Sequence, residues 1–418
     1  MPILFKRYEH QLPLARAIPG GDISLLKPFV NVGANKTSKT SVLRQHLLFV
    51  QVLSYLIAEI SHPVLAMYGI PNSRKSWVQR FIKEVIDPSI VPYLRKPKDE
   101  TAALQLFDHH YVCILDNLNS IPRALSDIIC GVATGLGQES RKLYSNDEAF
   151  IRAFRRCVML NGVNLPTQAG DLISRTILHP TEPQIGSRND TELMADYKKV
   201  LPLILGGFLD VIVKALTIKE TLGETKIFRL SDFSEWGAAI SVALGKTKKD
   251  FVDAMEENLN NQNAADVENN TVADMFLIFV KENFDSSNWT EETPYKKTPQ
   301  EIFTEVTEKA IAKKINIKSK RWISTPHGFT RKLNESKSSL IALGFHYEIG
   351  HDGTQRVMSI WRTDIENPEK KQYCKIVCVN FDSGDCSSDN WRNFTAETEK
   401  PLGCPGFKAR EKTGGDVN

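Results

Sequence analysis

The chain has 418 residues, a hydrophobic content of 41%, a charged content of 25% and a formal net charge of +3. These values exclude a collagen-like or wholly disordered chain, and the length favours two or three domains. The N-terminus lacks the apolar core of a signal peptide, and the two most apolar windows are interrupted by polar residues, proline or glycine. We therefore expect a cytoplasmic protein with no membrane partner.

Seven cysteines in a chain of this length fit a reduced protein better than a disulfide framework. Three of them, Cys113, Cys130 and Cys157, fall within apolar runs and are expected to be buried. The other four lie near the C-terminus and lack the C-x-x-C spacing typical of zinc sites, so zinc is only an alternative there. They are Cys374, Cys378, Cys386 and Cys404.

Residues 1–38 form an N-terminal extension that is mostly loop-like, and a helix is expected to begin near Ser41. The apolar runs "VLAMYG", "YVCILDN" and "RCVMLNGV" then alternate with the helical patterns "KSWVQRFIKEVI" and "IPRALSDIICGVATG". Strand and helix alternation with continuous apolar strands predicts a parallel α/β sheet covered on both faces, here over residues 39–190. Helical patterns follow over 191–288 and predict a helical lid or linker.

A further domain is predicted over residues 289–365. Thr298-Pro299 and Thr325-Pro326 each have the form of a helix N-cap followed by proline at the first helical position. Two alternating strands around "HDGT" then predict a hairpin. Helix, basic segment, helix and hairpin is the order of a winged-helix domain, and the tail 366–418 is expected to be loop or disorder.

The stretch Gly69–Ser76, "GIPNSRKS", has the length and ends of a phosphate-binding P-loop, although Arg74 replaces its second glycine. Such a loop wraps phosphate with backbone N–H groups, while lysine contacts the phosphates and Ser or Thr ligates magnesium. A chance strand, turn and helix is the alternative. The residues predicted to bind nucleotide are Gly69, Ile70, Pro71, Asn72, Ser73, Arg74, Lys75, Ser76 and Trp77.

Polar side chains end the next two apolar strands. Asp116 and Asn117 follow "YVCIL", where Asp116 could hold magnesium together with Ser76, and Asn161 ends "CVML", where an amide could orient an attacking water. The carboxyl ends of parallel strands meet at one edge of a sheet, which is where such folds bind ligands. Locally, "DN" and "NG" are equally compatible with simple turns.

The succession "LDNL", "LSD", "ATG", "RKLYSNDEAF" and "LNG" resembles ATP-binding proteins of phages, plasmids and other mobile elements. These are related to superfamily 3 helicases and to the helicase part of viral and plasmid primase-helicases. The resemblance implies an AAA+-type ATPase that uses ATP and Mg²⁺, forms a homo-oligomer such as a hexamer, and translocates on DNA. By position, Lys75 and Ser76 resemble the Walker A pair, Asp116 and Asn117 the Walker B pair, and Asn161 the sensor.

Three further features depend on this resemblance. Arg175 is placed like an arginine that reaches the γ-phosphate of a neighbouring subunit. Arg141 and Lys142 precede a hairpin that faces the DNA pore in superfamily 3 helicases, although with Arg155 and Arg156 they could equally form a solvated basic face. The similarity begins near Ile23, which implies that a primase or replication initiator would be a separate partner.

The predicted winged helix is basic. Between residues 309 and 337 there are nine lysines and arginines and one acid, which favours DNA phosphates as partners. Winged helices also bind proteins, so a protein partner for this domain is the alternative. The residues expected to contact DNA in this domain are Lys318, Lys320, Arg321, Arg331 and Lys332.

Departures from the family pattern leave two other functions open. Glycine is usual where Asn72 and Arg74 stand. Asn117 replaces the acidic base of most AAA+ proteins, although the family that the chain resembles commonly has Asn there, and Glu139, Asp147 or Glu148 are the substitute bases nearby in sequence. The chain could therefore be a nucleotide-binding adaptor with a degenerate loop. It could also be a sequence-specific DNA-binding regulator with a vestigial ATPase core.

Overall fold

The computed structural model divides the chain into two compact units, residues 1–282 with 299–342, and residues 283–298 with 343–418. The structure describes residues 8–30, 32, 38–141, 149–162, 170–181, 189–225, 227–284, 289–317, 322–353 and 355–363.

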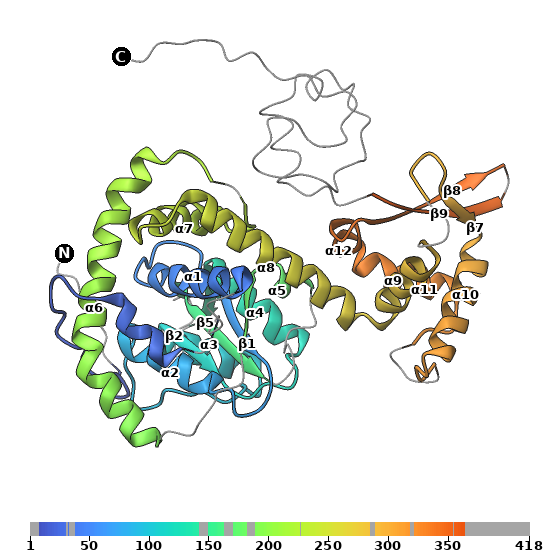
Figure 1. The fold of residues 1–418 in the computed structure, drawn as a ribbon. Helices are drawn as coiled ribbons and strands as arrows, with labels where there is room; N and C mark the ends of the chain where they lie inside the picture. Colours follow the sequence, from blue (N-terminus) through green and yellow to red (C-terminus); the bar gives the residue numbers. More distant parts are fainter. Residues whose placement is uncertain are drawn as a thin grey trace, which may run out of the picture. The chain divides into compact units, whose positions relative to one another are not determined.

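The first unit contains a four-stranded sheet in which every pairing is parallel, in the order β2-β5-β1-β6 (Figure 1). The predicted parallel α/β sheet is confirmed, including the position of the third apolar strand beside the second. The fourth strand, β6, was not predicted, because its five residues include a histidine and a proline. The strands are β1 (Val64–Tyr68), β2 (Val112–Leu115), β5 (Cys157–Gly162) and β6 (Thr176–Pro180).

Helices cover both faces of this sheet. Leu65 and Met67 of β1 belong to one buried cluster with α1 (Lys39–Ser54) and α2 (Lys75–Ile86). Alternate residues of the same strand, Val64 and Ala66, belong to a second cluster on the opposite face. Its helices are α3 (Glu100–His109), α4 (Arg123–Thr134) and α5 (Gly170–Ile173). Burial on both faces explains why the strands are apolar throughout.

Helices replace strands after residue 189, as predicted. They are α6 (Asp190–Thr221), α7 (Ser231–Ala243), α8 (Lys248–Asn269) and α9 (Thr271–Phe284). By length and composition α6 could cross a membrane, but 44% of its most apolar window is buried in the protein, and core helices pass the same test. This helix alone is therefore weak evidence for a membrane span.

The proline and glycines inside α6 have a packing role. The carbonyl of Pro202 accepts a hydrogen bond from the backbone N–H of Ile18 at 3.0 Å. A Cβ atom added to Gly206 would lie 1.7 Å from the carbonyl oxygen of Ile18, and one on Gly207 would lie 2.8 Å from the backbone nitrogen of Ile23. Residues 18–23, which lead into the 3₁₀-helix η1 (Ile23–Phe29), therefore lie directly against this helix.

The strands β3 (Leu136–Arg141) and β4 (Ala149–Phe154) form an antiparallel pair, which agrees with the hairpin implied at this point of the chain. Three helices complete the first unit: α10 (Pro299–Ala312), α11 (Pro326–Glu335) and α12 (Lys337–Ala342). The predicted cap of α11 is confirmed, because the hydroxyl of Thr325 accepts a hydrogen bond from the N–H of Gly328 at 3.1 Å.

The second unit contains a three-stranded antiparallel sheet in the order β7-β9-β8. Its strands are β7 (Tyr295–Lys297), β8 (Phe345–Asp352) and β9 (Gln355–Arg362). Asp352 pairs with Gln355, so the predicted hairpin is confirmed. The winged-helix domain over residues 289–365 stays a prediction, and the tail 366–418 lies outside the described residues.

Candidate functional site

The loop Gly69–Ser76 joins the carboxyl end of β1 to the first residues of α2. Asn72 and Arg74 both adopt left-handed backbone conformations, with φ of 63° and 55°. For a residue other than glycine this conformation costs about 1–2 kcal/mol, with asparagine the most tolerant. The side chains at these two positions therefore strain the loop, but its backbone still takes a conformation that glycine favours.

The first glycine of the loop is required by its surroundings. Gly69 has a φ of 141°, and a Cβ atom there would lie 2.8 Å from the hydroxyl of Thr181 and 2.9 Å from its carbonyl oxygen. The buried hydroxyl of Ser73 lies 2.7 Å from the same Thr181 hydroxyl. Thr181 follows β6, so the end of that strand fixes the inner side of the loop.

Lys75 is folded onto its own loop. Its ammonium donates hydrogen bonds to the carbonyls of Gly69 at 3.0 Å and Ile70 at 2.8 Å, and to the hydroxyl of Ser73 at 3.1 Å. Partial burial lowers the pKa of this ammonium below its ordinary value. To contact a phosphate, Lys75 would exchange neutral carbonyl partners for anionic oxygens, which form stronger hydrogen bonds with a cation.

Three predicted site residues from separate segments meet where their strands and helix converge. The hydroxyl of Ser76 donates to Asp116 Oδ1 at 2.7 Å, and the side-chain amide of Asn161 donates to the same oxygen at 2.6 Å. Asn161 also donates to Gln79 Oε1 at 2.8 Å, and its Oδ1 accepts from the backbone N–H of Asn117 at 2.8 Å. The predicted meeting of these residues at the carboxyl edge of the sheet is therefore observed.

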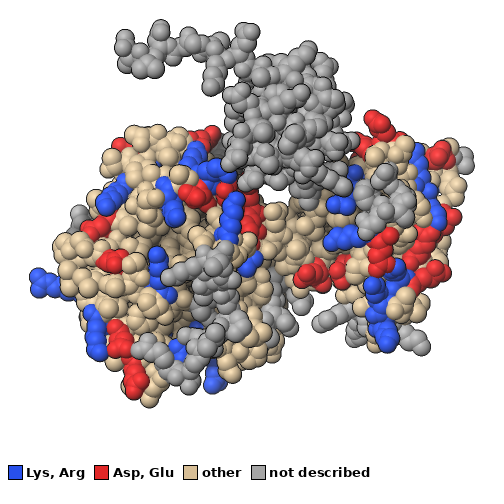
Figure 2. Space-filling view, viewed as in Figure 1, with Lys and Arg blue, Asp and Glu red and all other residues tan. Residues whose placement is uncertain are grey.

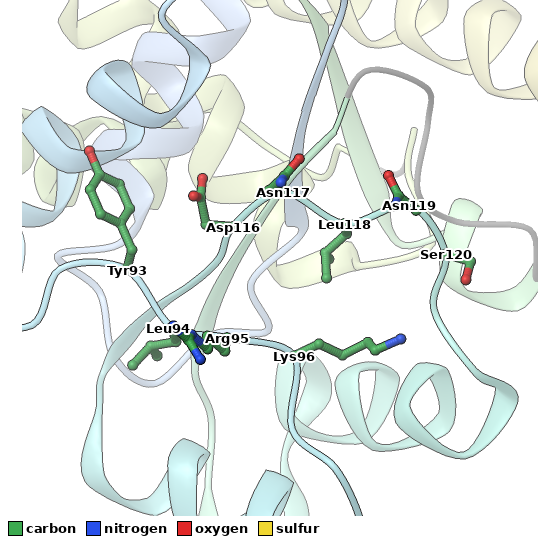
Figure 3. Close-up of a pocket in the computed structure, with 9 residues that line it drawn as sticks. All are labelled: Tyr93, Leu94, Arg95, Lys96, Asp116, Asn117, Leu118, Asn119 and Ser120. Atoms are coloured by element: carbon green, nitrogen blue, oxygen red, sulfur yellow. The ribbon is translucent and has the colours of Figure 1, made fainter.

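A cavity of about 520 Å³ opens beside this junction (Figure 3). Asp116 is the only acidic side chain among the nine residues that line it, and Asn117, with a φ of 55°, is exposed. A hydroxyl and a carboxylate oxygen are ligands that Mg²⁺ accepts, with phosphates and water completing its octahedron. The donor atoms of Ser76 and Asp116 thus fit a nucleotide-bound magnesium ion. The lining residues are Tyr93, Leu94, Arg95, Lys96, Asp116, Asn117, Leu118, Asn119 and Ser120.

Arg95 and Lys96 line this cavity but were not predicted. Leu94 places them there, because it forms a parallel β-bridge with Leu115 of β2. The N–H of Leu94 donates to the carbonyl of the residue before Leu115 at 2.8 Å, and its carbonyl accepts from the N–H of the residue after Leu115 at 3.2 Å. The segment "YLRKPK" has no strand periodicity, so the sequence offered a cluster of basic residues but no sign that they reach the edge of the sheet.

Two other predicted loop residues have different surroundings. Ile70 is half-exposed at the tip of the loop. The ring of Trp77 packs against Phe81 with 5.6 Å between centroids, and the guanidinium of Arg80 lies over it at 4.9 Å. Trp77 is therefore partly buried and packs against the core beneath α2.

Arg175 lies away from this junction. It immediately precedes β6, and its carbonyl accepts from the N–H of Val64 at the beginning of β1. Thr181, which contacts the loop, follows the opposite end of β6. At the rise per residue of a β-strand, Thr181 is about 20 Å from Arg175. Arg175 ion-pairs with Asp171, which also pairs with Arg229 at 2.8 Å. It therefore cannot reach the loop of its own chain.

The predicted DNA contacts are only partly described. Arg141 pairs with Ala149 in the β3–β4 ladder, and only its backbone is described. Arg331 is exposed on α11, whereas Lys332 ion-pairs with Glu335 at 2.5 Å. Figure 2 shows basic and acidic side chains interspersed over the visible surface. Outside the described residues lie Lys142, Lys318, Lys320 and Arg321.

Arg155 and Arg156 do not form a solvated basic face. Arg155 donates to the carbonyl of Thr134 at 3.2 Å, and Arg156 donates to the carbonyl of Phe107 at 2.5 Å. These carbonyls belong to the last turns of α4 and α3, where positive charge is favourable. Of the substitute bases, Asp147 and Glu148 lie outside the described residues, as does the side chain of Glu139.

The three cysteines of the core are buried, as expected. Burial raises the pKa of the Cys113 thiol to about 12 and that of Cys130 to about 11, and Cys157 is also a free, buried thiol. No group of three or more His, Cys, Asp or Glu that could hold a metal occurs within the described part of the chain. The four C-terminal cysteines fall beyond residue 363, outside that part.

The structure thus brings the loop, Ser76 and Asp116 together at one edge of the sheet. The chain belongs to the family of actinomycete integrative conjugative element replication proteins, whose pattern it matches over residues 37–262. Residues 272–371 match the AICE RepA C-terminal domain. This confirms the expected relation to proteins of mobile elements. No curated protein is significantly similar to the chain in sequence.

Several solved structures show a distant likeness. The C-terminal region of NrS-1 is 10% identical, with 86% of this chain and 79% of that chain covered and a TM-score of 0.39. The SCCmec type IV Cch active helicase is 12% identical, with coverage of 82% and 71% and a TM-score of 0.38. JCV helicase is 12% identical, with coverage of 54% and 71% and a TM-score of 0.26. TM-scores this low do not establish a shared activity.

Proposed function

We propose that this replication protein binds ATP and Mg²⁺ and hydrolyses ATP in a DNA-dependent reaction, as an AAA+ or superfamily 3 helicase-like motor. One observation carries the proposal. Ser76, Asp116 and Asn161, from three separate segments, converge within hydrogen-bond distance beside a loop that ends in Lys75. A P-loop ATPase needs this combination of a metal-binding hydroxyl, a carboxylate and a polar sensor.

In this mechanism Lys75 would neutralise the β- and γ-phosphates, and Ser76 and Asp116 would hold a magnesium ion. The bound ion supplies charge neutralisation on the phosphates. Asn161 orients Asp116 and, through Asn117, fixes the backbone where the attacking water would lie. Arg175 acts on the nucleotide of a neighbouring copy, so the active form is a homo-oligomer such as a hexamer.

The test is ATP turnover by the full chain with and without single-stranded DNA. Lys75→Ala should abolish turnover, whereas Lys98→Ala, which removes an exposed lysine outside the loop, should leave it unchanged. Absence of turnover in the wild type, with DNA present, would refute the ATPase proposal.

A nucleotide-binding adaptor is the second candidate, because Asn117 stands where most AAA+ proteins have a carboxylate base and Asp116 is the only acid among the nine described residues that line the cavity. Equilibrium binding of a fluorescent ATP analogue separates the two functions. Binding without turnover, abolished in Lys75→Ala, would favour the adaptor. The regulator alternative predicts sequence-specific footprints on the DNA of the element, whereas a motor should show little sequence preference.

DNA is the proposed macromolecular partner, with α11 of a winged-helix domain as one DNA-binding element and the β3–β4 hairpin as another. Arg331 is exposed and carries a charge that could meet a phosphate. Removing one positive charge that meets a phosphate should reduce the slope of log affinity against log salt by about 0.9. Arg331→Gln should reduce the slope by this amount, and Lys214→Gln on α6 should not. A primase or replication initiator, acting with it in the cytoplasm, is the proposed protein partner.

A further inference from the structure

We propose that Arg229 is a second arginine that acts, beside Arg175, on nucleotide bound by a neighbouring copy of this chain. This deepens the proposed ATPase function and rests on it. Arg229 lies in the motif "FRLSDFSEWG", just before α7, and is remote in sequence from the loop and from Asp116.

Both arginines converge on one carboxylate oxygen. Arg175 Nη1 and Arg229 Nη1 each contact Asp171 Oδ1, the second at 2.8 Å. Arg175 Nη1 also donates to the backbone carbonyl of Asp171 at 3.0 Å, and Arg229 Nη1 donates to the hydroxyl of Ser174 at 2.9 Å. Arg229 is 58 residues from Asp171, so only the fold brings the two guanidinium groups together.

Two arginines share one carboxylate in this cluster. Their guanidinium groups and the carboxylate leave a net charge of +1, and the carboxylate offsets the repulsion that would otherwise separate the cations. The groove beside them also carries Arg123 and Lys332 against Asp127, Asp266 and Glu335, so the excess of positive charge is confined to the pair of arginines. Hydrogen bonding from Arg175 lowers the pKa of Asp171 below its ordinary value, so the carboxylate stays ionised at neutral pH. Guanidinium groups bind phosphate oxygens with paired hydrogen bonds, which makes a nucleotide phosphate a fitting ligand.

The two arginines differ in how far they face solvent. The Arg175 side chain is 15% exposed and that of Arg229 is 49% exposed. The Nε of Arg175 is buried without a hydrogen-bond partner in the described part of the chain, so its present contacts leave it incompletely satisfied. Arg229, Asp171 and Ser174 line an open groove that also includes Arg123 and Asp127 of α4.

The position of the cluster determines whose nucleotide it could reach. It adjoins the amino end of β6, whereas the loop lies beyond the carboxyl end of the same strand. That separation is about 20 Å at the rise of a strand. A ring built from heterologous contacts, in which one face of each subunit meets a different face of the next, would bring this cluster to a neighbour's loop.

The test is subunit mixing with ATP turnover as the readout. Arg229→Ala should lower turnover by about 10³-fold or more, as removal of an arginine that stabilises phosphoryl transfer does, while Arg16→Ala, an exposed control, should not. Arg229→Ala mixed with Lys75→Ala should recover about a quarter of the wild-type rate. In a randomly mixed ring, that fraction of heterologous interfaces joins an intact loop to an intact arginine.

A purely structural or same-chain role predicts no recovery in this mixture. Recovery with Arg175→Ala plus Lys75→Ala, but not with Arg229→Ala plus Lys75→Ala, would overturn the role of Arg229 alone. No recovery in either mixture, with active wild type, would overturn the role of both arginines. Either result leaves the proposed ATPase function standing.

A second readout covers a wild type that binds ATP without turnover, which is the outcome that refutes the ATPase proposal. In that case mass photometry should show ATP-dependent assembly of the wild type and of Arg16→Ala, and its loss in Arg229→Ala. Equal ATP-dependent assembly of Arg229→Ala and wild type, or no assembly of the wild type, would overturn the inference.

Discussion

Replacing Asn161 by alanine should weaken the sheet edge that carries the proposed site. Asn161 is 3% exposed, and its amide donates to Asp116 at 2.6 Å and to Gln79, itself fully buried, at 2.8 Å. Its oxygen accepts from the N–H of Asn117 at 2.8 Å. Alanine would therefore remove these three hydrogen bonds, together with a longer one to the Ser76 hydroxyl at 3.5 Å, and leave buried polar atoms without partners.

The magnitude follows from the kinds of hydrogen bond that alanine removes. A neutral hydrogen bond contributes about 1 kcal/mol and one to a charged group about 1.5–3 kcal/mol, so the two short neutral bonds and the bond to Asp116 sum to about 3.5–5 kcal/mol. Asp116 keeps its bond from Ser76, and Asn117 is exposed to water, so part of the loss is recovered. We expect the free energy of opening to fall by about 2–4 kcal/mol.

The measurement is native-state hydrogen exchange of β5 and the residues after β2, because a chain of this size need not unfold in one step. The expected loss corresponds to exchange faster by a factor of about 30 to 1,000. Asn119→Ala, which truncates an exposed asparagine of the same cavity, is the control and should change exchange by less than about 3-fold. Similar exchange in the two variants would refute the proposed network.

Three further changes test the loop and the core. Gly69→Ala should lower the unfolding free energy by about 1–3 kcal/mol and abolish binding of an ATP analogue, because the added Cβ would collide with Thr181. An unchanged melting temperature would contradict this expectation. Arg74→Gly should stabilise the chain by up to about 1 kcal/mol, since relief of the left-handed strain exceeds the entropy cost of glycine, whereas Arg74→Ala should not. Burial lowers the pKa of His46 to about 4 and that of His179 to about 3, from 6.5. As the pH falls, the unfolded chain therefore binds protons first, so the contribution of these histidines to stability is full above pH 6.5 and falls as the pH drops towards 4. For His46 the loss of unfolding free energy at pH 5 is about 2 kcal/mol. The urea midpoint of His46→Gln should therefore depend less on pH than that of the wild type.

Much of the fold could be predicted because the signals are local. Continuous apolar runs identified β1, β2 and β5, and the cap at Thr325 and the hairpin at Asp352 follow from residues within a few positions of each other. The order of the loop, Asp116 and Asn161 along the chain also predicted that they would lie close together, because parallel strands present their carboxyl ends at one edge of the sheet.

Other features depended on contacts between distant segments. The sequence carried no sign that Leu94 would join the edge of the sheet and bring Arg95 and Lys96 to the cavity. It also could not pair Arg229 with Asp171, since periodicity and capping report only on neighbours along the chain.

The sequence by itself determined the order of the strands' apolar runs, the position of the loop and the polar residues that follow each strand. Only the tertiary structure decided that Lys75 folds onto its own loop and that Arg175 lies at the opposite end of β6, beside Arg229. The physical reason is that propensity and periodicity act within a few residues. The packing of helices on both faces of the sheet, by contrast, sets which side chains from remote segments share one carboxylate.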